Sequence, residues 1–104
     1  MQTTITARHA DIPDDLKTRA ATVVARLARR ANRPTSARVT FDTSRLVASA
    51  EIVLNASRNT VFVASAVAAD HRTALDRVAA KLQRQLMKRA GKPTRRGARK
   101  AVSR

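Results

Sequence analysis

Residues 70–89 read DHRTALDRVAAKLQRQLMKR, and the fold of the chain follows from this stretch. Apolar residues recur there at helical spacing and form one continuous stripe: Leu75, Val78, Ala79, Leu82 and Leu86. A row of cations keeps the same spacing on a face turned away from the stripe: Arg77, Lys81, Arg84 and Lys88. Asp70 precedes the first turn, where a carboxylate accepts hydrogen bonds from free backbone amides. We therefore predict a helix that packs its stripe on a core and presents a row of positive charge.

The preceding sequence alternates between strand and helix patterns. Residues 2–7 are rich in threonine, which is typical of a short strand. Pro13 and the acidic residues beside it mark a helix start, and the helical pattern continues to about Ala31. Three segments then place apolar residues at every second position, as strands with one buried face do: residues 36–43, 46–56 and 60–67.

The predicted element order is β-α-β-β-β-α, which is an α+β fold. Because each helix has a single apolar face, both helices should cover one face of a four-stranded sheet. A helix joins the first two strands, so these strands can pair in parallel, whereas the later strands form a meander. The other sheet face then exposes four valines: Val53, Val61, Val63 and Val67. Exposed apolar residues are common, so we favour an ordinary surface here over a surface through which the protein dimerises.

Residues 90–104 (AGKPTRRGARKAVSR) differ in composition from the rest of the chain. Six of these fifteen residues are Lys or Arg, and Gly and Pro interrupt any helix. We therefore expect one domain over residues 1–89 and a basic disordered tail over residues 90–104. The tail either follows a phosphate-lined channel or serves only as a solubilising end.

The charge of the chain indicates its partner. There are 22 basic and 7 acidic residues, a net charge of +15, and no acidic residue follows Asp76. Such an excess predicts a polyanionic partner, with nucleic acid favoured over an anionic membrane surface. Both phenylalanines fall on inward strand positions, so we expect no exposed aromatic platform for stacked bases. Binding should therefore depend on phosphates and on shape.

No catalytic motif is present. The chain has two histidines, two glycines and no cysteine, and it contains no HExxH, GxSxG or Walker-type sequence. We therefore expect no enzymatic activity, no cofactor, no bound metal and no small-molecule substrate. The N-terminus lacks the apolar core of a signal peptide and no apolar run is long enough to span a membrane, so we expect a cytoplasmic protein without membrane contact.

The helix over residues 70–89 resembles the second helix of the ribosome hibernation-promoting factors, a family that includes ribosome-associated inhibitor A. The similarity rests on Asp70, Ala74, Leu75, Asp76, Lys81, Leu82, Gln85, Leu86 and Lys88. The opening Met1-Gln2 and Ile5-Thr6 and the element order are also similar, so the resemblance covers about residues 1–92. The chain departs from the family at Arg72, where an aromatic residue is common, and at Ala80, where an acid is common. From its length we expect a protein without the C-terminal dimerisation domain of the long forms.

The resemblance implies a fold like that of double-stranded-RNA-binding domains and a short-form hibernation factor. Such a protein binds the small ribosomal subunit at the decoding region, near the subunit interface. There it occupies the space of mRNA and tRNA, and translation stops in stationary phase or under stress. By position, the resemblance implies ribosomal RNA contacts at Lys81, Arg84, Lys88, Arg89 and Lys92. The exposed row adds Arg77, and the first helix would contribute Arg19, Arg26 and Arg30.

We expect the free protein to be monomeric. The alternative function is that of a general double-stranded RNA- or DNA-binding module without a ribosomal role. Composition alone does not separate these two functions, because both need a basic surface.

Overall fold

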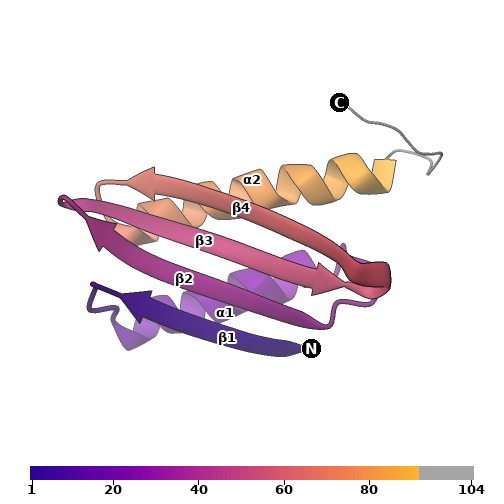
Figure 1. Ribbon diagram of the computed structural model, residues 1–104, viewed down its shortest axis with the longest axis horizontal. Coiled ribbons are helices and arrows are strands. Elements are labelled where there is room, and N and C mark those ends of the chain that lie inside the picture. Colours follow the sequence, from indigo (N-terminus) through magenta and orange to yellow (C-terminus); the bar gives the residue numbers. More distant parts are fainter. Residues whose placement is uncertain (92–104) are drawn as a thin grey trace.

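Four strands form one mixed sheet with the order β1-β2-β3-β4 (Figure 1). They are β1 (Gln2–Arg8), β2 (Ser36–Ser44), β3 (Val47–Ala56) and β4 (Thr60–Ala68). β1 pairs with β2 in parallel, and the two remaining pairs are antiparallel. The computed structural model describes residues 1–91. The predicted parallel pair and the meander that follows it are both confirmed.

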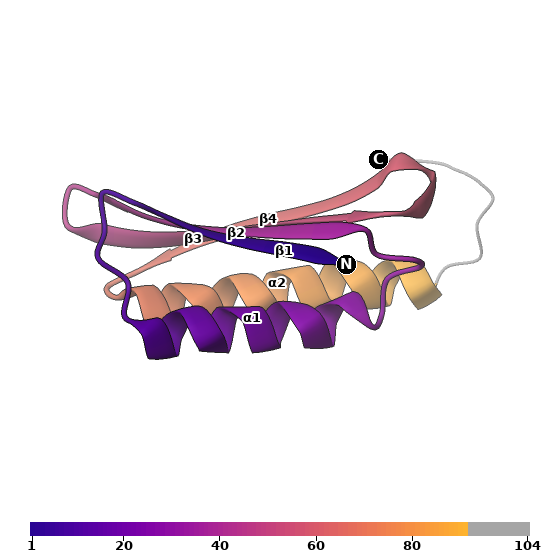
Figure 2. The ribbon, with the colours of Figure 1, turned by 90° about the horizontal axis from the view of Figure 1, so that it is seen from below.

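Both helices, α1 (Asp14–Ala28) and α2 (His71–Gly91), cover the same face of the sheet (Figure 2). They lie side by side and run in the same direction, and a short 3-10 turn, η1 (Ser57–Asn59), joins β3 to β4. The order β-α-β-β-β-α and the two-layer α+β architecture are therefore as predicted. In the described part of the chain no helix is long and apolar enough to cross a membrane.

The helix ends differ by a few residues from the prediction. α1 stops at Ala28, because the backbone N–H groups of Arg29, Arg30 and Ala31 bond three residues back and tighten the last turn. α2 continues to Gly91, two residues past the predicted domain boundary at residue 89. Lys92 and the rest of the predicted tail lie outside the described residues.

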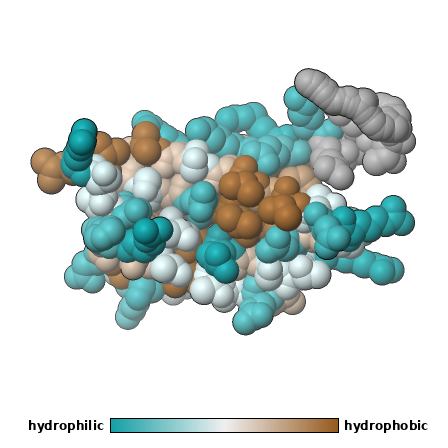
Figure 3. Space-filling model, viewed as in Figure 1, coloured by the Kyte–Doolittle hydropathy of each residue, from teal (hydrophilic) through white to brown (hydrophobic). Residues whose placement is uncertain are grey.

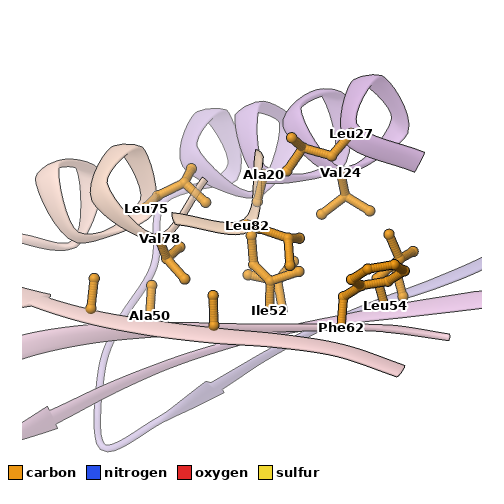
Figure 4. Close-up of a cluster of buried hydrophobic side chains, with 14 of the residues drawn as sticks. Ala20, Val24, Leu27, Ala50, Ile52, Leu54, Phe62, Leu75, Val78 and Leu82 are labelled. Carbon is orange, nitrogen blue, oxygen red and sulfur yellow. The ribbon is translucent and has the colours of Figure 1, made fainter. Parts of the chain in front are cut away.

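The core lies between the sheet and the two helices (Figure 4). Ile52 and Leu54 of β3 are 0% exposed, and so are three members of the α2 stripe, Leu75, Val78 and Leu82. The inner face of β4 carries mainly alanine, at positions 64, 66 and 68. Because these side chains are small, α2 can lie close to β4. Long side chains of α2 can therefore reach the backbone of β4.

The outer face of the sheet is open to solvent. Val61, Val63 and Val67 are 52%, 47% and 58% exposed, whereas Val53 is half-buried. Figure 3 shows an apolar patch on this face, which lies opposite the helices. The predicted exposure of the valine face is therefore confirmed for the three β4 valines.

Asp70 caps α2, as predicted. One carboxylate oxygen accepts a hydrogen bond from the backbone N–H of Thr73 at 2.8 Å, and the other accepts one from the Thr73 hydroxyl at 3.0 Å. These two bonds, the backbone bond foremost, lower the pKa of the Asp70 carboxyl below its ordinary value. The folded state thus favours the charged form of Asp70.

The variant Asp70→Ala will lower the thermal midpoint at neutral pH by several degrees, because α2 loses its cap. The pKa of Asp70 is lower in the folded state than in the unfolded chain, so the stabilisation is present above about pH 4 and is lost as the pH falls through the folded pKa. Thermal unfolding followed by circular dichroism between pH 7 and pH 2 measures the difference between wild type and variant. A difference that does not shrink in acid would contradict the role of Asp70 as a charged cap.

Candidate nucleic-acid interface

The buried stripe fixes the rotation of α2 about its own axis. Leu75, Val78 and Leu82 are fully buried against the sheet and α1, and Leu86 is 1% exposed. The four cations of the predicted row all remain exposed on the outside of the fold: Arg77, Lys81, Arg84 and Lys88. They do not share one environment, however, and the contacts of each side chain separate them into two sets.

The first set lies along the free edge of β4. Arg77 donates from Nη1 to the carbonyl oxygen of Val67 at 2.9 Å, and Lys81 donates from Nζ to that of Ser65 at 2.9 Å. Gln85 continues the series and donates from Nε2 to the carbonyl oxygen of Val63 at 2.8 Å. We call Arg77, Lys81 and Gln85 the edge clamp.

The spacing of the edge clamp follows from the geometry of the two elements. Four residues advance a helix by about 6 Å, and two residues advance a strand by about 6.6 Å. Donors at every fourth residue of α2 therefore meet carbonyls at every second residue of β4. The sequence prediction directed Arg77 and Lys81 toward RNA phosphates and named Gln85 only among the residues that carry the family resemblance, so it did not foresee the contacts with β4. Long side chains with N–H donors at positions i, i+4 and i+8 of a helix that follows an edge strand could have predicted these contacts.

Arg19 of α1 also has a partner within the protein. Its Nη2 lies 2.9 Å from Oδ1 of Asp76 on α2, and its Nε donates to the same oxygen at 3.3 Å. The two side chains are 40% and 49% exposed, so the pair contributes at most about 1 kcal/mol to stability. Its structural consequence is that it ties the two helices together near their N-terminal ends.

The same end of the molecule carries further internal contacts. His71 Nε2, in the first turn of α2, lies 2.9 Å from the carbonyl oxygen of Asp42 and 3.1 Å from the hydroxyl of Thr43. His9 Nδ1 lies 3.1 Å from Asp42 Oδ1, and this hydrogen bond is the main reason that the pKa of the Asp42 carboxyl is lowered. Both histidines thus have structural contacts that the sequence prediction did not foresee.

The second set of cations gathers at the opposite end. Arg26 and Arg30 lie in and just after the last turn of α1, and Arg84 and Lys88 lie in the C-terminal part of α2. Since the helices run in the same direction, these positions fall at one end of the helical layer (Figure 2). All four side chains are exposed, and none forms a hydrogen bond or an ion pair within residues 1–88, the part of the chain whose side chains are described. We call these four residues the basic end.

The side-chain positions of two predicted site residues, Arg89 and Lys92, are not described. Arg89 lies in the last turns of α2, but only its backbone is described. Lys92 lies outside the described residues. Among residues 1–91, no three side chains of His, Asp or Glu come together in a group that could hold a metal ion.

Comparison with known proteins gives a family match. A family model described as sigma 54 modulation protein / S30EA ribosomal protein matches residues 3–94. No curated protein sequence matches the chain significantly.

Solved structures give the same fold. The N-terminal domain of Protein Y from Thermus thermophilus has a TM-score of 0.73 and 23% identity, over 85% of this chain and 98% of that one. A ribosomal subunit interface protein from Coxiella burnetii has a TM-score of 0.71 and 19% identity, over 88% of this chain and 100% of that one. At these identities the two structures establish the fold of the chain and not the roles of its residues.

Proposed function

Because this chain belongs to the sigma 54 modulation protein / S30EA ribosomal protein family, we propose that it binds the small ribosomal subunit and inhibits translation. The membership confirms the resemblance to the hibernation-promoting factors. In this proposal the protein occupies the decoding region near the subunit interface, in the cytoplasm, during stress or stationary phase. It blocks the mRNA and tRNA sites by occupying them, and no chemical step is required.

The observation that carries the proposal is the basic end. Its four cations have no partner among the described side chains, and they stand on or directly after helices whose apolar faces are packed into the core. Because the backbone that carries these cations is already fixed, binding to a rigid array of phosphates has to order only their side chains. The net charge of +15 supplies long-range attraction toward ribosomal RNA.

The test is co-sedimentation with purified small subunits, with excess duplex RNA as competitor. If the protein reads the shape of the decoding region, pelleting persists when the competitor is present. Release by the competitor would favour the alternative, a general double-stranded RNA- or DNA-binding module. Cell-free translation with an mRNA reporter, at the same protein concentrations, then shows whether bound protein inhibits.

Affinity for the small subunit should fall steeply with salt. Each neutralised phosphate contributes about −0.7 to −0.9 to the slope of log affinity against log salt concentration. Four contacts from the basic end therefore predict a loss of roughly 50- to 150-fold between about 50 and 200 mM KCl. Fluorescence anisotropy of labelled protein measures this slope. A flat titration would exclude binding led by phosphate contacts.

A further inference from the structure

Two loops lie at the same end of the molecule as the basic end, and each contains an exposed arginine outside the predicted set of RNA contacts. One loop joins α1 to β2 and contains Arg33, and the other joins β3 to β4 and contains Arg58. We propose that these two arginines form a second phosphate-binding site, which extends the RNA-binding surface from the helices onto the end of the sheet. This inference rests on the proposed function, because it adds contacts to the same ribosomal RNA.

A backbone hydrogen bond brings the two loops together. The N–H of Ser57 donates to the carbonyl oxygen of Asn32 at 3.1 Å. Arg33 directly follows Asn32 in the chain, and Arg58 directly follows Ser57. This bond therefore brings two arginines that are far apart in the sequence to neighbouring places on one surface.

Further hydrogen bonds fix both loops to the sheet. The backbone N–H of Thr35 and its hydroxyl both donate to the carbonyl oxygen of Asn55, at 2.8 and 3.2 Å. The side chain of Asn55 in turn donates from Nδ2 to the hydroxyl oxygen of Ser36 at 2.9 Å. Because the backbone that carries the two arginines is already ordered, binding a phosphate has to order only their side chains.

The backbone conformation at both arginines is unfavourable for any residue except glycine. The φ angle is 52° at Arg33 and 60° at Arg58, in the left-handed region that glycine adopts without a steric penalty. Residues with a Cβ atom are less stable in this conformation, and such strained residues concentrate at functional sites. Both side chains are exposed, and neither forms a hydrogen bond or an ion pair within residues 1–88. Contacts inside the described structure therefore do not account for arginine at these two positions.

The location of the two arginines suits the same partner as the basic end. The C-terminal ends of both helices, the α1–β2 loop and the β3–β4 turn all lie at one end of the molecule (Figure 1 and Figure 2). Neither loop contains an acidic residue. RNA that contacts Arg30 or Lys88 can therefore continue onto the loops without meeting a negative side chain of either loop.

Removing both charges gives the first test. Arg33→Gln with Arg58→Gln deletes two proposed phosphate contacts, so the salt slope of small-subunit binding should become shallower by about 1.4–1.8. The matched control is Arg38→Gln with Arg45→Gln, which removes two exposed charges from the outer sheet face and from the β2–β3 turn at the opposite end. This control should leave the slope within error of wild type. The inference is overturned if the loop variant keeps the wild-type slope, or if the control changes the slope as much.

Glycine substitutions separate binding from folding. Arg45 also has a φ angle of 52°, so Arg45→Gly and Arg58→Gly both relieve a left-handed residue of its side chain. Each should raise the thermal midpoint by a few degrees. Only Arg58→Gly should weaken small-subunit binding, by about five- to eightfold at about 100 mM KCl. A lower midpoint in Arg58→Gly would assign the arginine to folding, and an unchanged affinity would refute its contact with phosphate.

Titration of wild type and the loop variant against both small subunits and a short RNA duplex separates this inference from the proposed function. If wild type binds the duplex as tightly as the subunits, the proposed function fails, and a shallower slope of the loop variant on the duplex still supports the loop site. If wild type selects small subunits and the loop variant has the same slope, the loop site fails and the proposed function stands. A wild-type protein that binds neither RNA refutes both.

Discussion

Reversing two charges at the basic end, with Arg84→Glu and Lys88→Glu in one variant, will abolish co-sedimentation with small subunits. Each substitution removes a cation that has no partner among the described residues and places an anion against phosphate. We expect the affinity at moderate salt to fall by at least about 100-fold. Both side chains are exposed, so the fold should be retained. Urea denaturation of the variant checks that expectation.

A matched variant reverses two charges elsewhere. Arg38 lies on the outer face of the sheet, opposite Val53, and Arg45 lies in the turn between β2 and β3; both are exposed. Arg38→Glu with Arg45→Glu changes the net charge by the same amount but leaves the helical layer intact. It should weaken binding far less than the basic-end variant does. Equal losses in the two variants would mean that net charge, and not the basic end, drives binding.

Removing the centre of the α2 stripe will have the largest effect on stability. Leu82 is 0% exposed within the core between α2 and the sheet. Leu82→Ala should lower the free energy of unfolding by about 2–5 kcal/mol, because it removes buried apolar atoms and leaves a cavity. Small domains are stable by only about 5–15 kcal/mol in total, so a large share of the stability is lost. Urea denaturation monitored by circular dichroism measures this change.

The control for Leu82 is Leu46, which is 93% exposed in the turn after β2. Leu46→Ala should change the free energy of unfolding by no more than about 0.5 kcal/mol. A loss below about 1 kcal/mol in Leu82→Ala would show that α2 is not packed on the sheet. In that case α2 would not be held rigidly enough to present the basic end.

Periodicity in the sequence was sufficient to predict the layers of this fold. Ile52 and Leu54 recur at every second position between Glu51 and Asn55, which predicts a strand with one buried face. The spacing of Leu75, Val78 and Leu82 predicts a helix with one buried face. These patterns record burial, which is the dominant stabilising term in folding. The Asp70 cap was predictable for a similar reason, since its acceptor and its donor are three residues apart.

The division of the cations was not predictable in the same way. The acceptors of the edge clamp are backbone carbonyls of β4. Every residue type has such a carbonyl, so the side chains of Ser65 and Val67 do not indicate that their carbonyls accept these bonds. The partner of Arg19 is Asp76, 57 positions away in sequence, and only the packing of α1 beside α2 brings them together. A helical pattern shows which side chains point away from the core. The partners that those side chains contact depend on the neighbouring strand and helix, whose positions the pattern does not give.

The parallel course of the two helices has an electrostatic consequence for the unbound protein. The peptide dipoles of each helix leave roughly half a negative charge at its C-terminus, and here both termini lie at the same end. Arg26, Arg30 and Lys88 stand within or beside these last turns, so the main-chain carbonyls there favour their positive charges. The protein can therefore hold these cations ready for RNA without ion pairs, within the described part of the chain, that binding would have to break.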